Sequence, residues 1–153
     1  ALAHCGTRPE DGKLQVEVVR HEAGTAWVVE ACRNAEAETG RPIVVDPKSP
    51  TVGVLPHLIA AGIRVKEIGP RDFMVAGQLV EHDCREGLLV HLNAGELNEA
   101  VRVAEVRKSG DSWVMSERNS SAEITCFKAV TLAAFAERTF VEAAPPGAPR
   151  RIR

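Results

Sequence analysis

The N-terminal part of the chain shows the two-residue alternation that is typical of a half-buried strand. Apolar side chains occupy every second position from Leu14 to Val18, so we expect residues 14–20 to form a strand. The apolar residues 1–5 come before a polar turn at 6–13 that contains an Asp-Gly pair. The pattern therefore predicts an N-terminal β-hairpin built from residues 1–5 and 14–20.

From residue 25 onward, the apolar period changes to that of helices separated by short apolar runs. The spacing predicts helices over 25–39, 55–61, 73–86, 97–104 and 124–141, the fourth of which exits through Arg107, Lys108 and Gly110. Strands are expected at 43–45, 63–68 and 113–115, while 88–92 fits either a strand or an extended connection. The continuous apolar run at 43–45 is typical of a buried parallel strand. Strands that alternate with helices favour an α/β fold, with a mixed sheet flanked by helices and the hairpin at one side.

Length and composition narrow the class of protein. The 153 residues suit one domain with its own core. A formal net charge of −2 argues against nucleic-acid binding through bulk positive charge, although it leaves room for a local basic groove. Aromatic residues make up 4% of the chain and tyrosine is absent, which argues against a base-stacking platform. No apolar run approaches the roughly 18 residues of a membrane span.

The four cysteines lie far apart and form no C-x-x-C pair, so no zinc ribbon or thioredoxin motif is present. Cys32, Cys84 and Cys126 each fall on an apolar helical face, where a free cysteine behaves as a small hydrophobic residue. We therefore expect buried structural thiols in a reducing cytoplasm. The five histidines form no metal-binding pair and are interpreted as surface or core residues.

Two carboxylates occur where the predicted fold would form a site. Ligands of open α/β sheets bind beyond the carboxyl ends of the strands, and Asp46 directly follows the run at 43–45. Glu123 comes directly before the last predicted helix, and Asp111 lies in a Gly-Asp turn. Structural roles are open for both main candidates, because Asp46 also suits a turn with the following proline and Glu123 also complements a helix dipole.

Together, Asp46 and Glu123 match the ligand preference of Mg²⁺ and Mn²⁺, which bind carboxylate oxygens from separate elements. Two such ions about 4 Å apart can hold both oxygens in phosphodiester hydrolysis. Basic side chains in the second half of the sequence are candidate phosphate contacts or else a solvated face. They are Arg71, Arg107, Lys108 and Arg118.

Several motifs together resemble the C-terminal nuclease domain of a tailed-bacteriophage terminase large subunit, as found in phages and prophages of actinobacteria. The resemblance covers most of residues 1–141 and depends on the order and spacing of the motifs. The motifs are QVEVVRHExGTxWVV at 15–29, IVVDPxSP at 43–50, LPxLxxAGI at 55–63 and GDSWxxSxRxSSAEI at 110–124, with the helix at 129–136 after them.

The resemblance implies an RNase H-like fold that cuts concatemeric double-stranded viral DNA with Mg²⁺ or Mn²⁺ during DNA packaging. It assigns Asp46 and Glu123 as catalytic and metal-binding residues and adds Asp111, which matches a Gly-Asp that such sequences often show. It also implies a bacterial cytoplasmic location and, in the full-length family protein, an ATPase domain, a portal and a small terminase subunit as partners. A homo-oligomer is compatible with it, and no membrane is involved.

The sequence departs from the family pattern at two places. The family has Asp where this chain has Glu123, and the added methylene moves the carboxylate by about 1.5 Å relative to a metal with strict geometry. The strand at 1–5 resembles the second strand of the family fold, so the first central strand, with its own Asp, would lie upstream of Ala1. No G-x-x-x-x-G-K-[ST] motif of an ATPase occurs either.

We therefore interpret residues 1–142 as an N-terminally incomplete nuclease domain and 143–153 as a flexible tail rich in proline and arginine. The chain begins without methionine, which indicates part of a longer protein. In the family fold the absent strand lies between the hairpin and the strand at 43–45, and its loss would expose two edges. Residues 1–5, or a partner chain, would then fill that position. The alternatives to an active nuclease are an inactive RNase H-like fragment, a DNA-contacting module of a prophage, or a small α/β interaction domain.

Overall fold

The computed structural model describes residues 1–110 and 112–140, excluding the side chains of Pro50 and Thr51. Within these ranges the chain is an α/β protein with five helices and three small sheets. The helices are α1 (Val28–Thr39), α2 (Leu55–Ala60), α3 (Pro70–Arg85), α4 (Gly95–Val103) and α5 (Thr125–Phe140), and a 3-10 turn, η1 (Pro50–Val54), precedes α2. The strands are β1 (Leu2–Thr7), β2 (Leu14–Arg20), β3 (Ile43–Val45), β4 (Val65–Glu67), β5 (Leu89–His91), β6 (Val106–Ser109) and β7 (Ser112–Met115).

The predicted N-terminal hairpin is confirmed. β1 pairs antiparallel with β2, and the strand extends two residues further than expected, to Thr7. On its other side β2 pairs in parallel with β5, which settles the ambiguous segment at 88–92 as a strand. The first sheet therefore has the order β1-β2-β5.

The second sheet consists of β3 and β4 in parallel, as the apolar run at 43–45 predicts. All three residues of β3 are only half-buried, so the expectation of a fully buried strand is wrong. The continuous apolar run predicted full burial, but one edge of β3 borders a cavity rather than another strand. The expected single mixed sheet is thus divided into separate pieces within the described residues.

The third sheet shows that the segment predicted as the exit of the fourth helix is a strand. α4 ends at Val103, and Arg107 and Lys108 lie on the strand β6, which pairs antiparallel with β7. Gly110 has a φ of 63°, a left-handed conformation that glycine adopts without strain, and this turn sends the chain back along β6. The Gly-Asp pair therefore marked a hairpin, although Asp111 itself lies outside the described residues.

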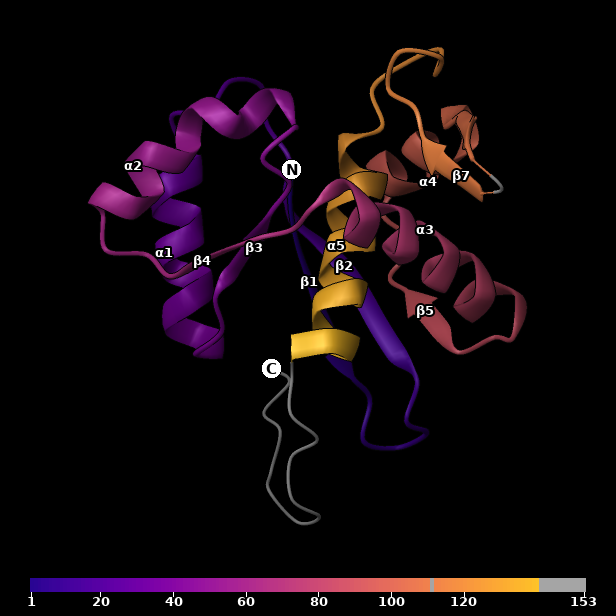
Figure 1. The fold of residues 1–153 in the computed structure, drawn as a ribbon. Helices are drawn as coiled ribbons and strands as arrows, with labels where there is room; N and C mark the ends of the chain where they lie inside the picture. The colour runs from indigo at the N-terminus through magenta and orange to yellow at the C-terminus, as the bar shows by residue number, and fades with distance from the viewer. Residues whose placement is uncertain (111, 141–153) are drawn as a thin grey trace.

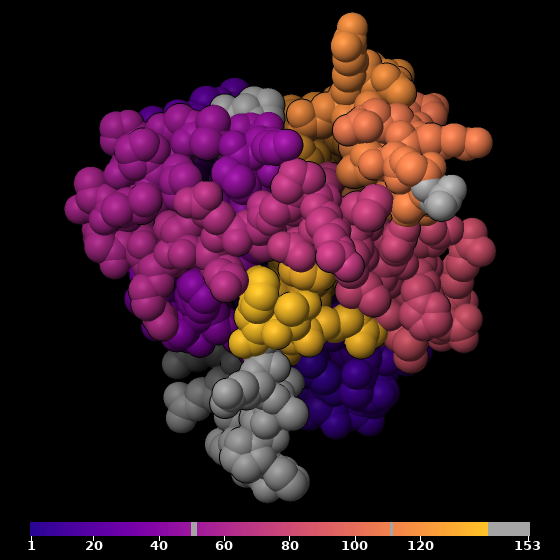
Figure 2. Space-filling model, viewed as in Figure 1, coloured from indigo at the N-terminus to yellow at the C-terminus, as the bar shows by residue number. Residues whose placement is uncertain are grey.

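The helix α5 is central to the packing. It contacts β1, β2, β3, α3 and α4, and in Figure 1 it lies between α1, α2, β3 and β4 on one side and α3, α4, β5 and β7 on the other. Figure 2 shows the same arrangement as a surface, with the C-terminal end of α5 (yellow) beside the magenta segments on its left. A helix with apolar residues on more than one face can join both groups of elements.

Three of the four cysteines are buried, and all four are free. Burial raises the pKa of the Cys5 thiol to about 12 and that of Cys32 to about 11, so both remain protonated at neutral pH. The burial predicted for Cys32 and Cys126 is confirmed, but Cys84 is exposed. It lies one residue before the end of α3 and lines a second cavity together with Leu97 and Val101 of α4.

No helix in residues 1–110 or 112–140 has the length and apolar character needed to cross a membrane. The predicted division into 1–142 and 143–153 falls partly outside the part of the chain that the structure describes. The predicted end of the last helix at residue 141 does so as well.

Candidate functional site

The two main candidate carboxylates lie on the wall of one cavity of about 1090 Å³. Asp46 follows β3, and Glu123 comes two residues before α5 begins. The sequence separates them by 77 positions (123 − 46), yet the strand end and the helix start bring both to this cavity. Both carboxylates therefore line the same cavity.

Asp46 is largely buried, with 12% of its side chain exposed. Its Oδ1 accepts a hydrogen bond from the backbone N–H of Lys48 at 2.9 Å, which fixes the carboxylate in the turn after β3. The Nζ of Lys128 lies 3.8 Å from Oδ2 and donates to Oε1 of Glu117 at 2.8 Å. Lys128 thus compensates the charge of the buried carboxylate.

Glu123 is more exposed, with 64% of its side chain accessible. Its Oε1 lies 3.3 Å from Nε2 of His21, in the segment that follows β2. A hydrogen bond from the Thr125 hydroxyl, helped by His21, lowers the pKa of the Glu123 carboxyl below its usual range. The group is therefore ionised near neutral pH and available as an oxygen ligand.

The oxygen chemistry of Asp46 and Glu123 suits a hard divalent cation, but the fit is incomplete. Among the described residues, no group of three His, Cys, Asp or Glu side chains is placed to hold a metal ion. Asp111, the third predicted site residue, lies outside those residues. The described part of this cavity therefore offers two carboxylates, Asp46 and Glu123, with the ammonium group of Lys128 beside Asp46.

The four candidate DNA contacts are exposed, as phosphate-binding residues must be. Arg71 lies in the first turn of α3, Arg107 and Lys108 lie on β6, and Arg118 follows β7. None of the four lines the cavity that holds the carboxylates. Their exposure is equally compatible with the alternative given in the sequence analysis, in which these residues belong to an ordinary solvated surface.

Three residues of the site were missed in the sequence: His21, Glu117 and Lys128. His21 and Glu123 are 102 positions apart, so no local spacing could join them. Lys128 could have been identified from the sequence, because a lysine near the start of a predominantly apolar helix needs a charged partner or a path to solvent. In the structure its Nζ also lies 5.2 Å from the ring centroid of Phe73, which adds a cation–π contact.

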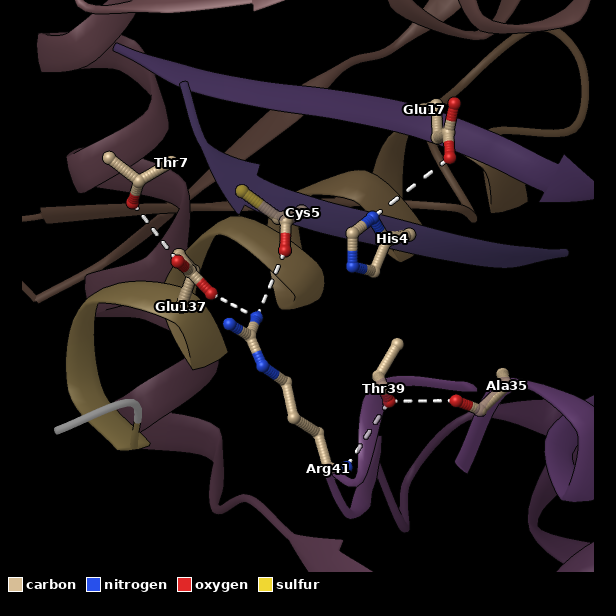
Figure 3. Close-up of polar contacts among 8 residues, drawn as sticks. All are labelled: His4, Cys5, Thr7, Glu17, Ala35, Thr39, Arg41 and Glu137. Atoms are coloured by element: carbon tan, nitrogen blue, oxygen red, sulfur yellow. Dashed lines mark hydrogen bonds and ion pairs between the residues drawn. The ribbon is translucent and has the colours of Figure 1, made fainter. Parts of the chain in front are cut away.

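The opposite end of the cavity carries a second polar group (Figure 3). Arg41 forms a hydrogen-bonded ion pair with Glu137 of α5, and its Nη1 also donates to the carbonyl oxygen of Cys5 at 3.2 Å. The Thr7 hydroxyl donates to the other oxygen of Glu137 at 3.0 Å. Glu137 is 6% exposed, so these contacts compensate a buried charge.

Searches against protein-family models, curated proteins and solved structures found no match for this chain. The functional proposal therefore depends on the motifs of the sequence and on the geometry of the cavity.

Proposed function

We propose that the chain is the RNase H-like nuclease domain of a phage DNA-packaging terminase, which cuts concatemeric double-stranded DNA by two-metal hydrolysis in the bacterial cytoplasm. One observation carries the proposal: Asp46, at the end of a parallel strand, and Glu123, before the last helix, line a common cavity. These are the two positions that the terminase motifs assign to metal ligands. In the whole family protein, an ATPase domain, a portal and a small subunit would work with this domain.

The arrangement of strands supports the RNase H-like part of the proposal. The family fold places one central strand between the hairpin and the strand that bears Asp46. Here the cavity lies between β1 and β3, and both strands line it. A cavity between these two strands is what the proposal expects at the position of that central strand.

In the proposed reaction, Asp46 and Glu123 would hold Mg²⁺ or Mn²⁺. The metal, when bound, stabilises negative charge on the phosphate and lowers the pKa of attacking water. The hydrogen bond from Lys48 N–H orients Asp46 toward the site, and Thr125 keeps Glu123 ionised. Arg71, Arg107, Lys108 and Arg118 would contact DNA phosphates outside the cavity.

Lys128 supports a second candidate, a DNA-contacting or interaction module without catalysis. An ammonium group 3.8 Å from Asp46 already neutralises the carboxylate that a metal would need. The two candidates differ in one measurable property, the affinity of the two carboxylates for a divalent cation.

Isothermal calorimetry with Mn²⁺ and plasmid nicking test the proposal together. We expect Asp46→Asn and Glu123→Gln each to weaken Mn²⁺ binding by at least about tenfold and to abolish nicking, since each removes a ligand oxygen charge. Glu99→Gln, which changes an exposed carboxylate on α4, is the matched control and should change neither. Lys128→Met should strengthen Mn²⁺ binding by removing the competing cation.

Wild-type protein that binds no Mn²⁺ at millimolar concentration would favour the non-catalytic module. Nicking that survives Asp46→Asn would show that the site assignment is wrong.

A further inference from the structure

The second cavity, which Cys84 lines, is separate from the one that holds the two carboxylates. It has a volume of about 660 Å³, and no described residue lines both cavities. This volume lies within the roughly 300–1,000 Å³ of ordinary small-molecule sites. Its main walls, α3, α4, β5 and β7, lie together on one side of α5 (Figure 1). The position between β1 and β3 therefore plays no part in it.

The two helices each direct one face into this cavity. On α3 the lining residues include Gly77, Val80 and Cys84, and on α4 they include Leu97 and Val101. Residues three or four positions apart share one face of a helix, so each set forms a continuous strip along its helix. These side chains are small or apolar, and the two helices therefore give the cavity an apolar inner surface.

The strands add alternate residues in the same way. Trp113 and Met115 are two positions apart on β7, as are Leu89 and His91 on β5, so each pair shares one face of its strand. A Cβ at Gly77 would lie 3.1 and 3.2 Å from two ring carbons of Trp113. The absence of a side chain at this glycine thus lets the indole ring lie against α3 and form part of the wall.

The polar side chains that line the cavity lie where it opens to solvent, and its inner end is apolar. These rim residues, all exposed or partly exposed, are Glu81, Arg85, His91 and Asn98. Val16 and Val80, which are 1% and 6% exposed, belong to the inner end. A molecule that fits this cavity therefore has an apolar body and a polar group at one end.

The turn that follows β5 fixes the hydrogen-bonding state of His91. Asn93 has a φ of 60°, a left-handed conformation that is uncommon outside glycine. Its backbone N–H donates to Nδ1 of His91 at 3.2 Å, and its Oδ1 accepts from Nδ2 of Asn98 at 2.8 Å. Because Nδ1 is the acceptor, the neutral ring carries its proton on Nε2. His91 therefore offers a hydrogen-bond donor at the rim.

The charged residues of the rim add further donors. Among the described residues that line the cavity, Glu81 and Arg85 are the acidic and basic ones, and they pair at 2.6 Å between Oε1 and Nη2. A guanidinium has five N–H groups in a planar fork, so this pairing leaves donors for a second carboxylate. The rim is thus suited to an anionic group, for which Glu81 competes.

We propose that the second cavity binds a small monocarboxylate with a hydrocarbon chain, of the fatty-acid class. The chain lies in the apolar interior between α3, α4 and β7, and the carboxylate lies at the rim. There Arg85 and Nε2 of His91 donate hydrogen bonds to it. The charge stays at the rim because burying it in the apolar interior is costly. The proposal goes beyond nuclease activity and is independent of it, because no metal takes part and the lining of this cavity includes neither Asp46 nor Glu123.

Isothermal calorimetry with decanoate, below its micellar concentration, tests the proposal on the 153-residue chain without metal. We expect saturable binding at one site per chain. Each buried methylene strengthens binding by about fourfold, so decanoate should bind about 15-fold more tightly than octanoate. Decylammonium has the same chain with the opposite charge and should bind at least about tenfold more weakly than decanoate.

Two rim variants test the place of the carboxylate. Arg85→Gln should weaken decanoate binding by about fivefold and leave the binding of decanol, which has no charge, unchanged. Glu81→Gln should strengthen decanoate binding because it frees the guanidinium. Arg33→Gln changes an exposed arginine on α1 that lines neither cavity, and this matched control should change nothing.

A third variant tests the apolar wall. Val101→Glu places a second negative charge beside the chain, and decanoate binding should fall by at least about tenfold. Val101 is 49% exposed, so the substitution leaves the buried core intact. Ile59→Glu is the matched control, because Ile59 is an exposed apolar residue of α2 that lines neither cavity.

The thiol of Cys84 reports where the ligand binds. Cys84 is exposed while the other three cysteines are buried, so a small aromatic disulfide reagent should react with it first in the folded protein. Bound decanoate should slow this reaction, with half of the effect at the Kd from calorimetry. An unchanged rate at saturating decanoate would overturn the proposal, since the ligand would then lie elsewhere. Decylammonium binding as tight as that of decanoate would overturn it as well, as would no saturable binding at millimolar decanoate.

Discussion

At the scale of single residues, buried charges determine where α5 can lie. Asp83 of α3 is 1% exposed and receives two hydrogen bonds from Arg138, at 2.8 Å from Nε and 2.7 Å from Nη2. Glu137, the neighbouring residue, pairs with Arg41 on the other side of the helix. A buried carboxylate depends on its partner, because an unpaired charge in the interior is costly. Two consecutive residues of α5 thus attach the helix to opposite parts of the molecule.

Arg138→Ala tests this dependence. The change leaves Asp83 buried without its bidentate partner, and we expect a loss of about 2–3 kcal/mol in the free energy of unfolding, reduced from the fully buried case because Arg138 is partly exposed. Urea denaturation measures it. Arg85→Ala on α3, which breaks an exposed pair with Glu81, is the control and should cost at most about 0.5 kcal/mol. Equal losses in both variants would contradict the account.

Some candidate residues could be predicted from the sequence and others could not. Asp46 was found because a carboxylate after an apolar run has a defined place in α/β sheets, and the structure puts it at the cavity. The arginine partners of Asp83 and Glu137 lie 55 and 96 positions away, so no local pattern could reveal them. Long-range charge pairing is decided by the packing of elements.

At the scale of elements, the sequence predicted the helices and strands whose apolar residues recur at regular spacing. It missed β6, in which they do not. The helix α3 and the hairpin strand β2 follow their apolar spacing closely. All four residues of β6 are exposed, so burial imposes no alternation on them, and the sequence predicted this segment only as the exit of the preceding helix. Its strand conformation depends on pairing with β7, which a single segment does not show.

The contact between α3 and β7 gives a second prediction. A Cβ at Gly77 would lie 3.1 and 3.2 Å from two ring carbons of Trp113, closer than most such contacts. Gly77→Val should therefore cost about 1–3 kcal/mol of unfolding free energy by overpacking. In Gly77→Ala, the gain of about 1 kcal/mol in helix propensity offsets the crowding, so its stability should stay near that of the wild type.

Thermal or urea unfolding of both variants checks this, with tryptophan fluorescence to report the surroundings of the ring. Wild-type stability for Gly77→Val would show that β7 moves freely away from α3.

At the scale of the whole molecule, the buried core consists of three separate clusters. One buried cluster includes Val16 and Val130, a second includes Phe73 and Ile124, and a third contains Cys32 and Leu58 beneath α1 and α2. No strand pairing in the described residues connects the β3–β4 sheet to the β1-β2-β5 sheet. Contacts through α5, including Lys66 of β4 over the Phe140 ring at 5.1 Å, join the two parts.

Native-state amide exchange should reveal this division. We expect α1, β3 and β4 to open with a smaller free energy than β1, β2 and α5, since sheet hydrogen bonds do not tie the first group to the second. Exchange measured at several low denaturant concentrations gives the opening free energy of each group, with the amides of Val16 and Val130 as reference. One common opening free energy for all elements would contradict the prediction.

The side chain of Arg41 has a consequence for the behaviour of the chain in concentrated solution. An uncovered edge strand is a template on which another copy can add its own edge, and repeated addition leads to aggregation. Natural proteins block such growth with a bulge or a charge placed at the edge. β1 has both, a register shift between Leu2 and Ala3 and the guanidinium of Arg41 on the Cys5 carbonyl. The guanidinium of Arg41 therefore occupies the Cys5 carbonyl, which another strand would need in order to pair at this edge.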